Sequence, residues 1–189
     1  MLELAATLDP NGIPAPVLTS PPVLTHLAEH RTHSTPGHGP AAPITAEQAY
    51  DTPRVLHRLS LIDHTPDTPQ QTVHMHQLIQ RAARESLPTD QYDRLARTVA
   101  DALTATWPDA ERDTALAQAL RANTEALTRH APEALHQPEA HSVLYRTAAS
   151  LGTTGQVTAA TTHFRHLADT VQHAGFCERI RDRRGAYGS

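Results

Sequence analysis

Apolar residues recur at helical spacing through the second half of the chain. Thr89 opens a segment with an apolar face, and Trp107-Pro108 closes it. The residues on this face are Tyr92, Leu95, Ala96, Val99 and Leu103. A second segment, from about Asp109 to His130, has the same spacing at Leu116, Leu120 and Leu127. Side chains three and four residues apart share one face of a helix, so we expect the two segments to pack as an α-hairpin.

Residues 141–174 contain a second pattern that predicts two antiparallel helices. Its members are Leu144, Ala148, Leu151, Gly155, Ala160 and Phe164. The two alanines permit close approach of the helices, the glycine suits the turn, and Phe164 is expected to fill the groove between the helices. These residues fall where the tetratricopeptide repeat (TPR) family places its packing residues, so the segment resembles one repeat. A repeat cannot bury both faces alone, and the preceding α-hairpin can serve as its neighbour.

The first part of the chain predicts short helices separated by turns. Residues 1–8 favour a helix that the turn residues of 9–14 terminate, and Pro21-Pro22 precedes a second apolar segment that extends to Leu27. A chain that opens on an uncapped helix is typical of a truncated protein. Residues 30–43 are polar and rich in proline and glycine, and we expect a mobile loop there.

A longer helix is predicted after this loop. Thr45 can cap a helix that begins at Ala46, and Pro53 is expected to kink or divide it. Its apolar contacts are expected from Ala49, Val55, Leu56 and Leu59.

Two short strands are predicted next, at residues 60–65 and 71–75, with the turn at 66–69. Helical spacing resumes at His76 and ends at Leu87-Pro88. A helix end, a β-hairpin and a helix start form the core of a small winged-helix unit.

Two segments, Leu56 to Ile62 and Val73 to Gln80, resemble the winged-helix part of the NB-ARC class of STAND signalling ATPases. In that family a Met-His-Asp type motif lies beside a nucleotide. Met75 and His76 match its first two residues, and Gln77 replaces the aspartate. The resemblance implies that His76 contacts the β-phosphate of ADP in an intact relative. In this chain, which has no phosphate cradle, we expect His76 to cap or pack the helix start.

The order of the two patterns is more specific than either alone, and it resembles an actinobacterial NB-ARC protein with TPR repeats. We therefore predict a mainly α fold with a winged-helix-like segment and small β-hairpin at 1–87. A helical TPR-like region at 88–174 and a disordered tail at 175–189 follow. The tail holds the lone Cys177 and a cluster of arginines, and ends where further repeats are expected, as after a frameshift or premature stop.

All 16 cationic residues are arginine. The absence of lysine excludes a Walker A phosphate loop and Schiff-base chemistry. We expect no enzyme activity and no cofactor in this chain, with ADP or ATP bound only in an intact relative. His30, His33 and His38 lack a nearby cysteine or a His-Glu-x-x-His pattern, so no metal site is expected.

A net charge of −4 gives no general reason to expect nucleic acid or anionic membrane as a partner. The chain has no signal peptide and no apolar run that could span a membrane, which favours the cytoplasm. The function expected is a non-catalytic regulatory fragment that binds a protein partner through its helical repeats.

Two alternatives remain open at the level of sequence. One is a DNA-binding regulator that uses Arg54, His57 and Arg58, although Asp63 and Asp67 in the wing disfavour contact with phosphate. The other is a decayed, truncated gene product, whose exposed apolar surface would promote aggregation.

Overall fold

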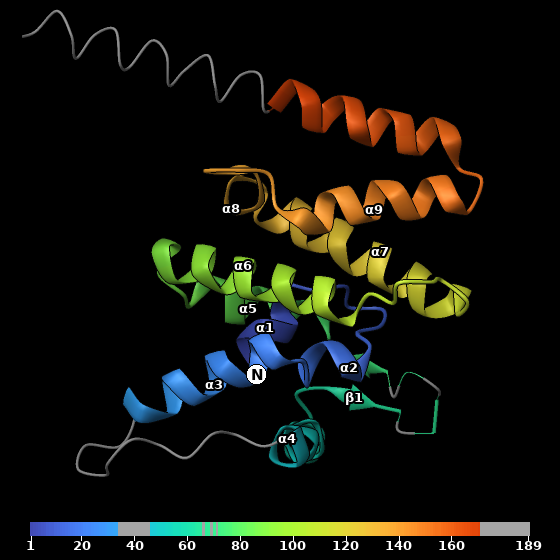
Figure 1. Cartoon of the computed structure of the whole chain (residues 1–189). Coiled ribbons are helices and arrows are strands. Elements are labelled where there is room, and N and C mark those ends of the chain that lie inside the picture. Colours follow the sequence, from blue (N-terminus) through green and yellow to red (C-terminus); the bar gives the residue numbers. More distant parts are fainter. Residues whose placement is uncertain (34–45, 66, 69, 71, 171–189) are drawn as a thin grey trace, which may run out of the picture.

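The chain is mainly helical in the computed structural model, which describes residues 1–33, 46–65, 67, 68, 70 and 72–170 (Figure 1). Within these ranges the only sheet is a two-stranded antiparallel one. The predicted helical character is therefore confirmed. The predicted cap at Thr45, most of the expected loop and the tail at 175–189 lie outside the described residues.

Short elements make up the first half of the chain. Its helices are α1 (Leu2–Ala6), α2 (Ala15–Leu18), α3 (Pro21–His33), α4 (Ala46–Arg58) and α5 (Gln77–Glu85). Strands β1 (Asp63–His64) and β2 (Val73–His74) lie between α4 and α5 and pair with Asp63 opposite His74. Val73 also forms a bridge with Ile13, through backbone hydrogen bonds of 2.8 and 2.9 Å. The segment between α1 and α2 is thus joined to the β-hairpin.

Longer helices make up the second half. They are α6 (Thr89–Thr106), α7 (Thr114–His130) and α9 (Ser142–Thr153), with the short α8 (Pro132–His136) before α9. A further helix occupies residues 157–170, the last that the structure describes. The apolar faces predicted for α6 and α7 are largely buried, with Leu95, Leu103, Leu120 and Leu127 no more than 3% exposed.

Two helix boundaries differ from expectation. α3 continues to His33, so residues 30–33 are helical and not part of a loop. α7 begins at Thr114 because the Asp113 side chain accepts a hydrogen bond from the Leu116 amide (3.0 Å) and caps the helix there.

α4 runs through Pro53 without division, since a helix can persist after losing one backbone hydrogen bond. Ala49 and Pro53 are buried on one face of α4, and Leu56 is partly buried there. Val55 is 53% exposed, and Leu59, just after α4, is 63% exposed. The apolar contacts predicted for these two residues are therefore wrong. The apolar residues of this segment are spread over more than one face of the helix, and the rest of the protein covers only one of these faces.

One hydrophobic core crosses the boundary predicted at residues 87 and 88. It includes Leu4 of α1, Val23 of α3, Leu103 of α6 and Leu167 of the last helix. α6 is central to this core because it contacts α1, α2 and α3 as well as α7, α8 and α9. Figure 1 shows α6 between the N-terminal helices and the helices that follow it.

Side chains of α5 satisfy the end of α1. Gln80, only 2% exposed, donates hydrogen bonds through Nε2 to the carbonyl oxygens of Ala5 (3.2 Å) and Leu8 (2.9 Å). Arg84 Nη1 donates to the carbonyl oxygen of Ala6 (2.6 Å). The last carbonyls of a helix have no partner inside it, so these contacts supply partners from a distant part of the chain.

Asn123 of α7 holds the loop that follows α1. Its side chain is fully buried, and its Oδ1 accepts a hydrogen bond from the Asp9 amide (3.1 Å). Its Nδ2 donates to the carbonyl oxygens of Gly12 and Ala119, each at 2.8 Å. One carboxamide therefore connects α7 to both ends of a turn more than one hundred residues away.

We expect the substitution Asn123→Ala to lower the free energy of unfolding by about 2 kcal/mol, because it leaves two partly buried backbone groups of the turn without a partner. Urea denaturation followed by circular dichroism measures the change. Gln118→Ala, an exposed amide on the same helix, should change stability by less than about 0.5 kcal/mol. Equal losses in the two variants would show that the buried carboxamide does not hold the turn.

Candidate functional site

A groove of about 820 Å³ lies between α7, α9 and the helix at 157–170. We call it the α7–α9 groove. Its lining from α7 extends from Gln118 to Arg129, its lining from α9 includes Thr147, and the last helix contributes His163 and Leu167. Figure 1 shows the last helix running beside α9, after a tight turn. It is the natural candidate for a binding site because three helices present polar side chains to one space.

The residues that predicted the helix pair form its turn and part of its interior. Gly155 has φ +80°, a left-handed conformation that favours glycine, and it lies in the turn as predicted. Leu144, Ala148 and Ala160 are at most 7% exposed, and Leu151 is partly buried. Gly152, which the pattern did not single out, faces Ala160, and a Cβ at position 152 would make an ordinary van der Waals contact of 3.8 Å with the Cβ of Ala160.

Phe164 differs from expectation. The spacing placed it between the two helices, yet it is 44% exposed, and Leu167, one turn later, is buried at 4%. Leu167 takes the interior position because the buried stripe of this helix includes Ala160 and Leu167, which lie seven residues apart and so share one face.

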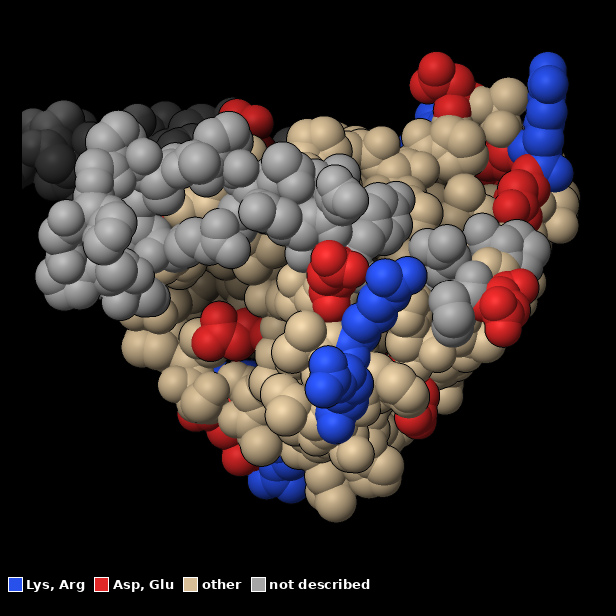
Figure 2. Space-filling view, turned by 90° about the horizontal axis from the view of Figure 1, so that it is seen from below, with Lys and Arg blue, Asp and Glu red and all other residues tan. Residues whose placement is uncertain are grey.

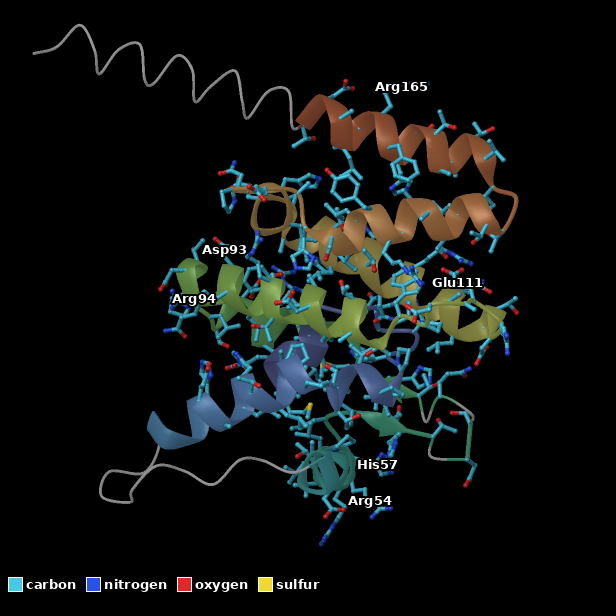
Figure 3. The ribbon with its side chains drawn as sticks, viewed as in Figure 1. Arg54, His57, Asp93, Arg94, Glu111 and Arg165 are labelled. Atoms are coloured by element: carbon cyan, nitrogen blue, oxygen red, sulfur yellow. The ribbon has the colours of Figure 1, made fainter. Side chains whose placement is uncertain are left out.

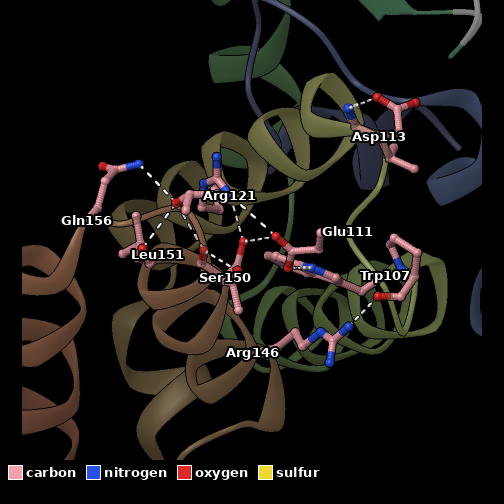
Figure 4. Close-up of polar contacts among 12 residues, drawn as sticks. Trp107, Glu111, Asp113, Arg121, Arg146, Ser150, Leu151 and Gln156 are labelled. Atoms are coloured by element: carbon pink, nitrogen blue, oxygen red, sulfur yellow. Dashed lines mark hydrogen bonds and ion pairs between the residues drawn. The ribbon is translucent and has the colours of Figure 1, made fainter.

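Arg121, which lines the groove, belongs to a polar cluster with Trp107, Glu111 and Ser150 (Figure 4). Trp107 Nε1 donates to Glu111 Oε1 (2.8 Å), and Ser150 Oγ donates to Glu111 Oε2 (2.8 Å). Arg121 Nη1 donates to Ser150 Oγ (2.6 Å) and lies 3.8 Å from Glu111 Oε2. The Arg121 and Glu111 side chains are only 15% and 12% exposed. These contacts join the α6–α7 linker to α7 and α9.

The lining of the α7–α9 groove carries more basic than acidic groups. The basic ones are Arg121, Arg129, His136, His163 and His166, and the acidic one is Glu125. Arg129 Nη2 pairs with Glu125 Oε1 at 2.9 Å, and both side chains are well exposed. The rings of His136 and His166 meet edge to face with centroids 5.9 Å apart.

His141 begins α9 and thereby sets one wall of the groove. Its Nδ1 accepts a hydrogen bond from the Val143 amide (3.2 Å), and its Nε2 lies 3.1 Å from Asp101 Oδ1 of α6. This pattern requires the neutral tautomer with the proton on Nε2. Burial lowers the pKa of His141, and the nearby Asp101 carboxylate opposes this shift only in part.

His76 occupies a helix start and does not line the groove. It is exposed, and its Nδ1 accepts a hydrogen bond from the Leu78 amide (3.2 Å), which confirms the expected capping of α5. That nitrogen is therefore committed to the backbone.

The residues considered for DNA binding lie on α4, at the edge of the molecule (Figure 3). Arg54 pairs with Asp51 at 3.3 Å, and His57 Nδ1 lies 3.0 Å from the carbonyl oxygen of Ile62. Arg58 is exposed. Figure 2 shows acidic and basic side chains together on this face, so its described residues do not form a uniformly basic surface.

The histidines considered as metal ligands do not form a described site. His30 stacks on His26 with ring centroids 4.0 Å apart, and the side chains of His33 and His38 lie outside the described residues. In the described ranges no group of three or more His, Cys, Asp or Glu side chains is placed to hold a metal ion.

Of the residues that the sequence pattern singled out, Leu144 and Leu151 line the groove, but its polar residues were missed, Arg121 above all. The available signal was a polar stripe on α7, since Arg121, Glu125 and Arg129 are four residues apart. The contacts of Arg121 with Ser150 and Glu111 could not be predicted, because they join separate segments of the chain and the sequence pattern does not show how these segments pack.

Comparison of the chain with protein-family models, with curated proteins and with solved structures found no match. Among the described helices, none combines the length and the apolar character needed to cross a membrane.

We expect Glu111→Ala to lower the free energy of unfolding by about 2 kcal/mol, because it leaves the Trp107 indole and the largely buried Arg121 guanidinium without their shared partner. Urea denaturation measures the change. Asp109→Ala removes an exposed carboxylate from the same linker and serves as the control. If both variants match the unsubstituted protein, the cluster does not stabilise the α6–α7 linker.

We expect stability to fall as the pH is lowered below about 6.5, the ordinary pKa of histidine. Because the pKa of His141 is lowered in the folded protein, the unfolded chain binds a proton in this range that the folded chain does not. His141→Asn keeps a capping side chain but cannot titrate, so it should reduce the slope of stability against pH. His26, whose pKa burial lowers to about 4, will preserve part of the slope.

Urea midpoints of both proteins at several pH values between 7.5 and 5 test this expectation. Parallel curves for the two proteins would contradict it.

Proposed function

We propose that this chain is a non-catalytic regulatory fragment of an NB-ARC signalling protein with TPR repeats, and that it binds a protein partner in the α7–α9 groove. The groove is the observation that carries the proposal. It has walls from three helices, and about 820 Å³ of space opens between them.

The helix pair supports a TPR-like role. α9 and the helix at 157–170 are joined by a turn at Gly155, and they approach closely at Gly152 and Ala160. α6 and α7 form the preceding α-hairpin, and both contact α9. Stacked helix pairs of this kind expose one long concave surface, which is suited to an extended polypeptide.

The N-terminal half supports a winged-helix-like role. Helix α4, the β1–β2 hairpin and helix α5 follow one another as the resemblance implies, and Ile13 adds a further bridge to the small sheet. In an intact relative this unit would clasp the closed, nucleotide-bound state. Here the cap formed by His76 serves the fold of α5, and we assign it no step with a nucleotide.

Site-specific photo-crosslinking in cells tests the groove as a protein-binding site. A photoreactive phenylalanine at Thr162, which lines the groove, should give a discrete crosslinked adduct with a partner. The same residue at Thr25 of α3 should not. Both threonines are exposed and donate a hydrogen bond to the carbonyl four residues earlier, so the two positions are matched.

Equal crosslinking at both positions, or none at Thr162, would contradict a binding role for the groove. ATP hydrolysis by the purified chain would contradict its non-catalytic character.

A further inference from the structure

We propose that the α7–α9 groove takes an extended, acidic segment of a partner protein, and that Arg121 in its lining receives one of the carboxylates. This inference rests on the proposed function and adds to it the chemical class of the partner.

The size of the groove suits a short length of extended chain. Its lining on α7 spans Gln118 to Arg129, a rise of about 16 Å along the helix. An extended polypeptide advances about 3.3 Å per residue, so about five residues fit along this wall.

The charges in the groove oppose those of the whole chain. The chain has a net charge of −4, whereas the lining has two arginines and three histidines against the single carboxylate of Glu125. Histidine is neutral or positive and never repels an acid. Glu111 lies beside Arg121 in the polar cluster, but it does not line the groove. The lining therefore attracts a negatively charged segment and disfavours a positive one.

Arg121 is held in position before a partner arrives. Its Nη1 is fixed by Ser150 and by Glu111, and in the described part of the chain Nε and Nη2 have no partner. A guanidinium offers donors in a planar fork that matches a carboxylate. Since the protein already restrains this side chain, binding costs less side-chain entropy than it would for a free surface arginine.

The threonines of the groove complement a peptide backbone. Thr128, partly buried, and Thr162, exposed, each donate their hydroxyl proton to the carbonyl four residues earlier, at 2.8 and 2.9 Å. Each oxygen keeps lone pairs that can accept a hydrogen bond. The groove can thus offer acceptors for backbone amides and, at Arg121, donors for a carboxylate.

Fluorescence anisotropy with the full chain tests the proposal. The probes are three labelled ten-residue peptides, one rich in glutamate, one in lysine and one in serine and glycine. We expect the glutamate peptide to bind at least tenfold more tightly than the neutral peptide, and the lysine peptide not to bind. Raising the salt concentration from 50 to 300 mM should weaken the glutamate complex several-fold.

Two arginines provide a matched pair of variants. Arg129 pairs with Glu125 and Arg94 with Asp90, in both cases with an exposed acid four residues earlier and at about the same distance (2.9 and 3.0 Å). Only Arg129 lines the groove, and Arg94 lies on α6 (Figure 3). Arg129→Gln should weaken binding of the glutamate peptide about fivefold, and Arg94→Gln should leave it unchanged.

Arg121→Gln should weaken binding at least tenfold, with folding checked by circular dichroism because Arg121 belongs to the polar cluster. Equal binding of the neutral or lysine peptide, or equal losses for Arg129→Gln and Arg94→Gln, would overturn the acidic partner and leave a protein-binding groove. If no peptide binds and Thr162 gives no crosslink, the proposed function fails as well.

Discussion

Two buried carboxamides hold the N-terminal segment against the rest of the protein. α1 has only five residues, which is too short to be a stable helix alone, and the turn after it has little regular structure. Gln80 supplies partners for carbonyls at the end of α1, and Asn123 supplies partners for the turn. Without them, burial of Leu4 and Leu8 would leave polar backbone groups unpaired in the core. The order of the first thirteen residues thus depends on side chains from α5 and α7.

α7 connects the contacts of the N-terminal segment to the α7–α9 groove, because one side of this helix packs against the core and another side lines the groove. Leu120, Asn123 and Leu127 are buried against the core, whereas Arg121, Glu125 and Thr128 line the α7–α9 groove. A shift of α7 would disturb both. The polar cluster restrains the same helix at the α6–α7 linker, where Glu111 accepts hydrogen bonds from Trp107 and Ser150. The contacts that stabilise the fold therefore also determine the shape of the groove.

Two helices begin in the same way, with a histidine whose Nδ1 accepts a backbone hydrogen bond. His76 caps α5 in an exposed position and His141 caps α9 in a buried one. Burial lowers the pKa of His141, which links the stability of a groove wall to pH.

The sequence by itself determined the mainly helical character, the start of α6, the β-hairpin and the turn at Gly155, because local spacing, proline and glycine act over a few residues. The tertiary structure decided which apolar positions are covered: Val55 and Leu59 remain exposed, and Leu167 is buried where Phe164 was expected. The tertiary structure also determined the groove, where Arg121 contacts Ser150, 29 residues away in the sequence. It likewise determined the contact between Asn123 and Gly12, which are 111 residues apart. Local patterns contain no information about such partners, because the contacts arise only when the helices pack around α6.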